Sequence, residues 1–352
     1  MNKERTFLVG LVVLVGCLVF SLLFSPLAAT AADKVYRFKI QSAFPAGDKS
    51  SDLLDVFAAS AASRSKGQIK ISVFRAPEIV PIENLFSATK RGTIDMMQSA
   101  GVVHGEIIPA AYVEFGLPGA FQVPHIDSFI GKAEEIRNLF MDRGLADILR
   151  EEYAKQGLYF LDIHVYGPVP VTVSKVNPKK CSDLEGLIVR SDGLNMKYQT
   201  AVGMKAISIP GEEAYLSLKT GVLDAAEWDI SAITGMKWHE VAPYWLRGME
   251  ADEALGEIAI NMKVWNKLPD NIKEILKASG KDYFYATVAG YKGELEIADQ
   301  LIKEGKLFSV DLDQECKDKY AAMAKQLMDE VAQTDAASAK AVKIIKQWRG
   351  WE

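Results

Sequence analysis

The chain is poor in the two residue types that most often carry metal or nucleophilic chemistry. Its 352 residues include 4 histidines and 3 cysteines. None of the histidines, at positions 104, 125, 164 and 239, lies in a nucleophile elbow, a zinc-protease motif or a local triad signature. No C-x-x-C or H-x-x-x-H pair indicates a zinc site, and no G-x-G-x-x-G or Walker loop indicates a nucleotide site. The sequence therefore gives no specific support for an enzyme.

Positive charge is also scarce. Lysine and arginine total 41 against 46 aspartates and glutamates, which gives a formal net charge of −5 at pH 7. The basic residues form no stripe along the chain. A mildly acidic chain of this kind argues against a nucleic-acid partner.

One long apolar run is present, at the N-terminus. Residues 7–24 are almost wholly apolar, follow Lys3 and Arg5, and precede an A-x-A site at residues 29–31. This plan predicts a secretory signal peptide over residues 1–31 and a periplasmic protein. Two alternatives stay open, an uncleaved membrane anchor and a lipid anchor at Cys17, because residues 14–17 resemble a lipobox.

Processing at this site leaves two cysteines, Cys181 and Cys316. A disulfide between them is one alternative in an oxidising compartment. Nothing in a single sequence pairs them, so two unpaired and partly buried thiols are the expectation.

Alternating apolar residues and helical spacing predict strand–helix–strand–helix–strand for the first part of the mature chain. The expected strands are residues 35–43, 68–75 and 94–98, and the expected helices begin at residues 51 and 83. This order indicates an α/β fold in which a mostly parallel sheet is covered by helices. Ligands of such sheets lie at the carboxyl ends of the strands.

The plan repeats further along. Strands are expected at 158–165, 169–173, 187–190, 205–209, from 224, and at 257–264. Residues 83–95 and 212–224 share one pattern, a helix, a glycine cap and a strand that opens on aspartate. We therefore expect two lobes, lobe I from residues 33–160 with about 254–300, and lobe II from residues 161–253.

A helix is expected over residues 270–305. At about 1.5 Å per residue it exceeds one small lobe, so we expect it to brace both. Residues 306–352 are expected to be helical, mainly at 320–331 and 336–348. The strands that cross between the lobes near Leu161 and Ile258 are the expected hinges.

Two strand ends carry candidate binding residues. Arg190 ends the expected strand 187–190, where its planar guanidinium can pair with a carboxylate in a way that lysine cannot imitate. The simpler alternative is a surface ion pair with Asp192 or Glu212. Glu227 and Trp228 end the neighbouring strand, where the carboxylate can hold a cation and the indole can wall a short carbon skeleton.

The chain resembles the solute-binding proteins of tripartite ATP-independent periplasmic (TRAP) transporters over essentially the whole mature chain. The motifs that carry the resemblance are GQIKISV at 67–73, GTID at 92–95, DLEGLIVR at 183–190, EAYLSLKTGVLD at 213–224 and VWNKLP at 264–269. Their order and spacing together are specific, although each alone is not.

The resemblance implies a two-lobed Venus-flytrap fold with a long helix across both lobes. It implies capture of a small organic acid and delivery to the small and large membrane subunits of an ion-driven permease. Arg190 would grip the substrate carboxylate. The DAAEW run at 224–228 resembles the branch that binds 2-oxo and 2-hydroxy acids with a Na⁺ or Ca²⁺ ion, held by the Glu227 side chain and the Trp228 carbonyl.

The sequence departs from that branch at two points. The branch has a glutamine metal ligand about twenty residues before the arginine, whereas this chain reads YGPVPV at 166–171. Asp229 follows Trp228 where the branch has smaller, uncharged residues. Asp229 can replace the lost ligand, recognise a donor group on the substrate, or face solvent.

Lobe I should complete the site with residues at its strand ends. The candidates are Phe44, Gln98, Ser99 and His104. Three other functions stay open: a periplasmic enzyme acting on organic acids, a receptor that presents ligand to a sensor, and a binding protein for an amino acid or compatible solute, whose ammonium Asp229 would meet.

Overall fold

The computed structural model describes residues 34–114, 117 and 119–351. Contacts divide the chain into two units, Met1–Val35 and Tyr36–Glu352. In the first unit only Lys34 and Val35 are described, so the expected signal peptide, its cleavage site and Cys17 lie outside the described residues. Within the described part of the chain, no helix has the length and apolar character needed to cross a membrane.

The second unit contains two sheets. The first has five strands in the order β2-β1-β3-β10-β4. Parallel pairs join β1 to β2 and β3, and β10 lies antiparallel between β3 and β4. The strands are β1 (Tyr36–Ser42), β2 (Ile69–Phe74), β3 (Met96–Ser99), β4 (Leu158–Val169) and β10 (Ala251–Asn261). We call this sheet and its covering helices lobe I.

Two helices of lobe I end or begin at a clear local sequence signal. In α4, Gly92 closes the helix with a positive φ of 83°, and in α10 the Asn261 side chain caps the first turn. No prediction covered residues 100–157, which contain four of these elements. The lobe I helices are α2 (Lys49–Asp52), α3 (Leu54–Arg64), α4 (Ile82–Arg91), α5 (Gly101–His104), η1 (Pro109–Val113), α6 (Phe129–Met141), α7 (Leu145–Lys155) and α10 (Met262–Asn266).

The second sheet has six strands in the order β11-β9-β5-β8-β6-β7. β5 is antiparallel to β8 and β9, and the other pairs are parallel. Its strands are β5 (Val171–Ser174), β6 (Ile188–Arg190), β7 (Lys205–Ile207), β8 (Ala225–Trp228), β9 (Tyr244–Arg247) and β11 (Phe308–Asp311). The helices of this lobe, lobe II, are η2 (Cys181–Leu184), α8 (Leu194–Thr200), α9 (Gly211–Thr220), η3 (Ile230–Ala232) and η4 (Trp238–Glu240).

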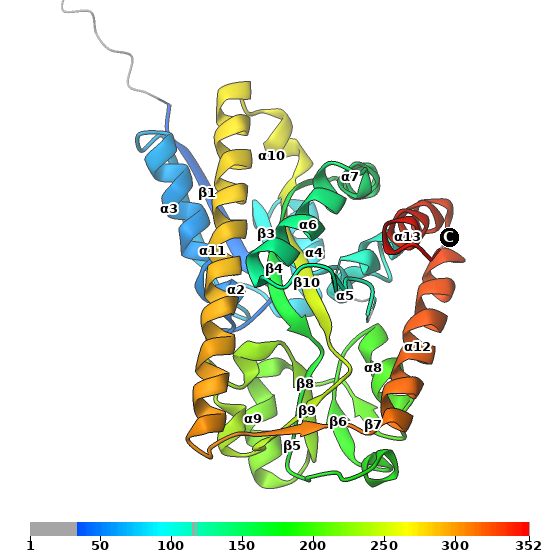
Figure 1. Cartoon of the computed structure of the whole chain (residues 1–352). Helices are drawn as coiled ribbons and strands as arrows, with labels where there is room; N and C mark the ends of the chain where they lie inside the picture. Colours follow the sequence, from blue (N-terminus) through cyan, green and yellow to red (C-terminus); the bar gives the residue numbers. More distant parts are fainter. Residues whose placement is uncertain (1–33, 115–116, 118, 352) are drawn as a thin grey trace, which may run out of the picture. The chain divides into compact units, whose positions relative to one another are not determined.

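The long helix α11 (Asp270–Lys303) runs beside both sheets in Figure 1. Its Tyr283 hydroxyl donates to the Ser50 carbonyl in lobe I at 2.7 Å, and its Tyr291 hydroxyl donates to Asp229 in lobe II at 3.0 Å. After β11, α12 (Gln314–Ala332) packs on α8 of lobe II, and α13 (Ala336–Arg349) packs on η1 and α7 of lobe I. The two-lobed α/β fold expected from the sequence is confirmed.

Several local predictions were wrong. Residues 306–352 are not only helical, since β11 adds a strand beside β9. Cys181 and Cys316 are buried, as expected, but they form a disulfide. Ile258 pairs with Gln98 and Asp162 inside the first sheet, so it cannot be a hinge, and Leu161 is packed in the core of the same lobe. The chain passes between the sheets at residues 169–171 and 247–251.

Candidate functional site

The candidate site is built at the carboxyl ends of two neighbouring strands of lobe II. β6 and β8 are parallel, and Arg190 pairs in register with Ala226. The next two residues of β8 are Glu227 and Trp228, so the strand pairing brings all three together. The sequence expectation that these strand ends converge therefore agrees with the register.

Arg190 is 5% exposed, and its guanidinium is held from several sides. Nε donates to the Ile209 carbonyl and Nη1 to the Glu227 carbonyl, both at 3.0 Å. The group lies 4.5 Å from the centre of the Trp228 ring, an arrangement that favours a cation. Nη2 pairs with Asp192. The predicted ion pair with Asp192 is present, but the arginine is buried and not on the surface.

Glu227 is buried next to Arg190 without forming a salt bridge with it. Its two carboxylate oxygens accept from the Ser191 hydroxyl at 2.9 Å and from Asn195 Nδ2 at 3.2 Å. Burial raises the pKa of Glu227 to about 7, against the opposing effects of the Arg190 charge and these hydrogen bonds. Near neutral pH, the site can therefore hold either form of this carboxyl group.

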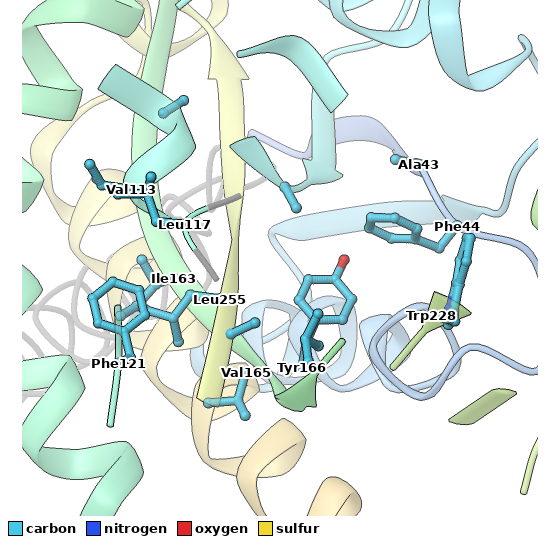
Figure 2. Close-up of a cluster of buried hydrophobic side chains, with 14 of the residues drawn as sticks. Ala43, Phe44, Val113, Leu117, Phe121, Ile163, Val165, Tyr166, Trp228 and Leu255 are labelled. Atoms are coloured by element: carbon cyan, nitrogen blue, oxygen red, sulfur yellow. The ribbon is translucent and has the colours of Figure 1, made fainter. Parts of the chain in front are cut away.

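Trp228 faces lobe I. Phe44 packs edge-to-face on its ring with centroids 5.9 Å apart, and Phe44 also packs on Tyr166 at 5.2 Å. Figure 2 shows Phe44 beside both rings. Trp228 Nε1 donates to Asp48 Oδ2 at 3.1 Å. Trp228 therefore contacts the Arg190 guanidinium and two lobe I residues at the same time.

Asp229 is buried rather than facing solvent, which removes one of its three expected roles. It accepts from the Ser231 amide at 2.6 Å and from the Tyr291 hydroxyl at 3.0 Å. Burial raises the pKa of Asp229 and of Asp48, and the charge of Asp48 raises the pKa of Asp229 further. Both carboxyl groups therefore bind a proton more readily than an exposed aspartate does. They come from different lobes.

The lobe I candidates divide into two groups. Phe44 packs on Trp228. Gln98 reaches only Asp48, through Ser50, since its Nε2 donates to Ser50 Oγ at 3.2 Å and Ser50 donates to Asp48. Ser99 lies within the sheet, where its carbonyl is 3.3 Å from His164 Nε2. These positions make Gln98 a supporting residue and leave Ser99 in the interior of lobe I.

His104 lies in the interior of lobe I. Its Nε2 is 2.6 Å from the Tyr153 hydroxyl and 3.5 Å from Glu257, and its ring packs on Phe86. Burial lowers the pKa of His104 to about 3, so the ring is neutral. Each of these partners belongs to lobe I, so the structure gives His104 no contact with Arg190 or Trp228 among the described residues.

Sequence reasoning missed the residues that complete the site. Asp48 and Asp229 each cap a helix, and each accepts a backbone amide in that role. A capping pattern predicts where a helix starts. It does not predict that the same carboxylate also contacts the opposite lobe. Ser191 and Asn195, which hold Glu227, follow Arg190 so closely that the strand-end argument for Arg190 could have included them.

Comparison with known proteins identifies the family. The DctP model, described as bacterial extracellular solute-binding protein, family 7, matches residues 41–335. The chain belongs to this family. Its members are the periplasmic receptors of TRAP transporters and not enzymes. A relative in Nostoc sp., the monocarboxylate 2-oxoacid-binding periplasmic protein, is 24% identical over 82% of this chain and 77% of its own.

Two solved structures match the fold at a TM-score of 0.78. One is a TRAP solute-binding protein of Chromohalobacter salexigens with bound (S)-(+)-2-amino-1-propanol, 24% identical, covering 90% of this chain and 96% of its own. The other, from Pseudoalteromonas atlantica with bound sodium and pyruvate, is 22% identical and also covers 90% of this chain and 96% of its own. Small solutes, with or without an ion, occupy these relatives.

Only some of the ligands expected for the Na⁺ or Ca²⁺ ion that the resemblance implies are present in this chain. Glu227 and the Trp228 carbonyl are present, but β5, which pairs with this strand end, offers Val171 opposite Trp228 and no glutamine. Both oxygens of Glu227 already accept hydrogen bonds from Ser191 and Asn195. The ligand set is therefore incomplete. Arg190 is the positive group that the described residues themselves place at the site.

Proposed function

We propose that this chain is an extracytoplasmic receptor that captures a small organic acid between its lobes and delivers it to the membrane subunits of a TRAP permease. The observation that carries the proposal is the setting of Arg190. Backbone carbonyls fix Nε and Nη1 and the Trp228 ring covers one face, so the guanidinium has one orientation. A fixed, buried fork of this kind is suited to one carboxylate.

In the proposed binding step, the carboxylate of the solute takes the Nη2 edge of Arg190, where Asp192 now lies. The Trp228 ring and Phe44 form an apolar wall for the carbon skeleton. A solute that touches both walls favours the closed arrangement by its differential affinity, because Phe44 and Trp228 come from different lobes.

The expected signal peptide over residues 1–31 is part of this proposal, as are two lobes that the chain connects at residues 169–171 and 247–251. Export to the periplasm agrees with the family's location and with a disulfide between Cys181 and Cys316, which forms in oxidising compartments.

A second candidate cargo is an amine or amino acid. The inter-lobe pair Asp48–Asp229 favours it, since the two carboxyl groups have no lysine or arginine partner among the described residues and an ammonium could replace their proton. The bound amino alcohol in the Chromohalobacter relative is consistent with this chemistry. Arg190 would then bind the carboxylate of a zwitterion.

The test is a thermal-shift screen of small carboxylates and amino acids, followed by calorimetry on the hits. A ligand that binds raises the melting temperature by linkage, so each hit shows as a shift. Each screen is run with added sodium or calcium and again with chelator. A shift that chelator abolishes identifies a divalent ion. Arg190→Ala should weaken binding of the best hit by about 2–5 kcal/mol.

Arg247→Ala is the matched control for Arg190→Ala. Arg247 also stacks on a tryptophan, with its guanidinium 4.0 Å from the Trp245 ring, and pairs with Glu250 away from the two strand ends. Its replacement should leave affinity unchanged. Equal affinity of the Arg190→Ala variant and the natural protein would rule out the proposed anchor.

A further inference from the structure

The loop that follows Arg190 supplies a second charged group to the site. Asp192 pairs through Oδ2 with Arg190 Nη2 and accepts from the Ser208 hydroxyl through Oδ1. The other guanidinium donors named above go to the backbone carbonyls of Ile209 and Glu227. Asp192 thus takes the same edge of Arg190 that the proposed function assigns to the carboxylate of the solute.

The two members of this ion pair differ in exposure. The Arg190 side chain is 6% exposed, whereas the Asp192 side chain is 38% exposed. Asp192 can therefore leave the guanidinium and be solvated at little cost, but Arg190 cannot leave. No other basic side chain pairs with Asp192 in the part of the chain that the structure describes. A carboxylate of the solute can therefore displace Asp192 from Arg190.

Lobe I touches this loop directly. Gly193 has a positive φ of 54°, and a Cβ at that position would lie 2.5 Å from Val102 Cγ2 in α5 of lobe I. Any side chain at residue 193 would therefore collide with the opposite lobe, so the glycine lets the loop pack under it. Because this loop also carries Asp192, an exchange of Asp192 for a solute takes place at the lobe interface.

Acidic groups also border the position that Asp192 would vacate. Glu227 is held beside Arg190 by Ser191 and Asn195, and Asp192 itself remains tethered two residues from the arginine. A second carboxylate on the same solute would meet Asp192 and the ionised form of Glu227 without an arginine partner of its own, whereas the charge of a single carboxylate is balanced by Arg190. The environment therefore discriminates by the number of acidic groups on the solute.

We propose that Asp192 is a specificity-determining residue that competes with the cargo for Arg190 and discriminates against dicarboxylates. The inference rests on the proposed function, because it takes Arg190 as the carboxylate anchor. The apparent affinity of any carboxylate is reduced by the fraction of receptors in which Asp192 occupies Nη2.

Calorimetry with a fixed panel of acids tests the inference. Pyruvate, lactate and propionate serve as monocarboxylate probes, and malonate and succinate as dicarboxylate probes. Asp192→Ala should tighten monocarboxylate binding by about 3- to 30-fold, because the competitor is gone. Dicarboxylates should gain more than monocarboxylates, because they lose a repelling charge as well.

Matched variants separate competition from other roles. Asp192→Asn removes the charge but keeps an acceptor, so its affinity should fall between those of the natural protein and Asp192→Ala. Asp329→Ala is the control, since Asp329 pairs with Lys346 at 2.9 Å at similar exposure on α12 and its loss removes the same formal charge. That control should change no affinity.

Each outcome decides a specific point. Weaker monocarboxylate binding by Asp192→Ala would overturn the inference, because Asp192 would then support the orientation of Arg190. Unchanged affinity together with a large loss in Arg190→Ala would also overturn it while leaving the proposed function intact. Failure of every panel acid to bind both the natural protein and Asp192→Ala would contradict the carboxylate anchor and the inference with it.

Discussion

Trp228 Nε1 donates a 3.1 Å hydrogen bond to Asp48 Oδ2, and this bond joins the end of β8 in lobe II to the loop after β1 in lobe I. The same indole lies under the Arg190 guanidinium. One side chain therefore forms a wall of the candidate site and a contact that exists only when the lobes are together. We therefore expect binding and closure to be coupled through this residue.

Replacing Trp228 with phenylalanine should weaken solute binding. The variant keeps an aromatic wall but loses the donor to Asp48, which leaves a buried acceptor with one partner fewer. The closed state should lose about 1–3 kcal/mol, or roughly 5- to 150-fold in affinity. Calorimetry gives the affinity, and small-angle scattering should show a more open ligand-bound protein.

Trp245→Phe is the control for that variant. Trp245 is as deeply buried and also carries a stacked arginine, but its Nε1 has no hydrogen-bond partner among the described residues. Its loss therefore removes the same atoms without an inter-lobe bond. Equal losses of affinity in the two variants would contradict a specific role for the Trp228–Asp48 bond.

A methyl group at Gly235 should hold the lobes apart. A Cβ at this residue of lobe II would lie 2.1 Å from the Gly47 carbonyl oxygen of lobe I, and backbone cannot move aside as a flexible side chain can. Gly235→Ala should therefore fold normally but bind about 5- to 150-fold more weakly, since overpacking typically costs about 1–3 kcal/mol. Calorimetry and chemical denaturation measure the two properties separately.

Gly293→Ala supplies the comparison. Gly293 lies in α11, where a Cβ would meet nothing within 4 Å. This variant should keep its affinity and gain about 0.5–1 kcal/mol of stability, because alanine favours a helix. If Gly235→Ala binds as tightly as Gly293→Ala, the Gly47–Gly235 contact does not form on closure.

The sequence alone predicted what local patterns determine. Apolar alternation located the strand ends at Arg190 and Trp228. The strand expected at 257–264 was wrong at its end, since β10 ends at Asn261 and α10 follows. Contacts between segments that are distant in the chain produce no local sequence pattern and were not predicted. Asp48 and Trp228 are 180 residues apart, and Asp48 carries the ordinary mark of a helix cap. A single sequence gives no pairing information of that kind.

The strand β11 escaped prediction for a related reason. Its four residues, FSVD, are mostly exposed and alternate too briefly to indicate a strand. They become one because Phe308–Asp311 pairs in parallel with Tyr244–Arg247. Tertiary pairing, not local propensity, forms this element.

Glu257 should make stability depend on pH. It is fully buried, and burial raises its pKa to about 7 from its usual value near 4.5. Between those values the folded state binds the proton more tightly than the unfolded state, so the free energy of unfolding falls as pH rises. The contribution is present below about pH 4.5 and is lost by about pH 7, with a size on the order of 2–3 kcal/mol.

The measurement compares the natural protein with Glu257→Gln, by urea denaturation at pH 5 and pH 8. The difference between the two proteins reports Glu257 together with its buried neighbour Glu114, whose pKa burial and then the Glu257 charge raise. Burial lowers the pKa of His104 and His164 to about 3 and gives these two histidines the opposite slope in both proteins. The natural protein should lose more stability than the variant across this range. Parallel slopes would show that Glu257 ionises normally.

The Cys181–Cys316 disulfide should stabilise the fold without contributing to binding. It ties η2, between β5 and β6, to the first turn of α12, 135 residues away, and Asp313 accepts from both cysteine amides at 3.0 Å. Closing so long a loop restricts the unfolded chain, so replacing both cysteines with serine should cost about 2–5 kcal/mol. The two cysteines pack with a different cluster from the one that contains Trp228, so affinity should not change.

Denaturation of the natural protein with and without reductant, beside the double serine variant, checks this prediction. Cys17→Ser is included in every sample so that its thiol cannot react. Reduced natural protein and the double variant should unfold at the same, lower denaturant concentration, while calorimetry shows the same affinity for all samples below their transitions. If reductant does not change the denaturation midpoint of the natural protein, and free thiols are detected in the untreated sample, the two cysteines are unpaired in solution.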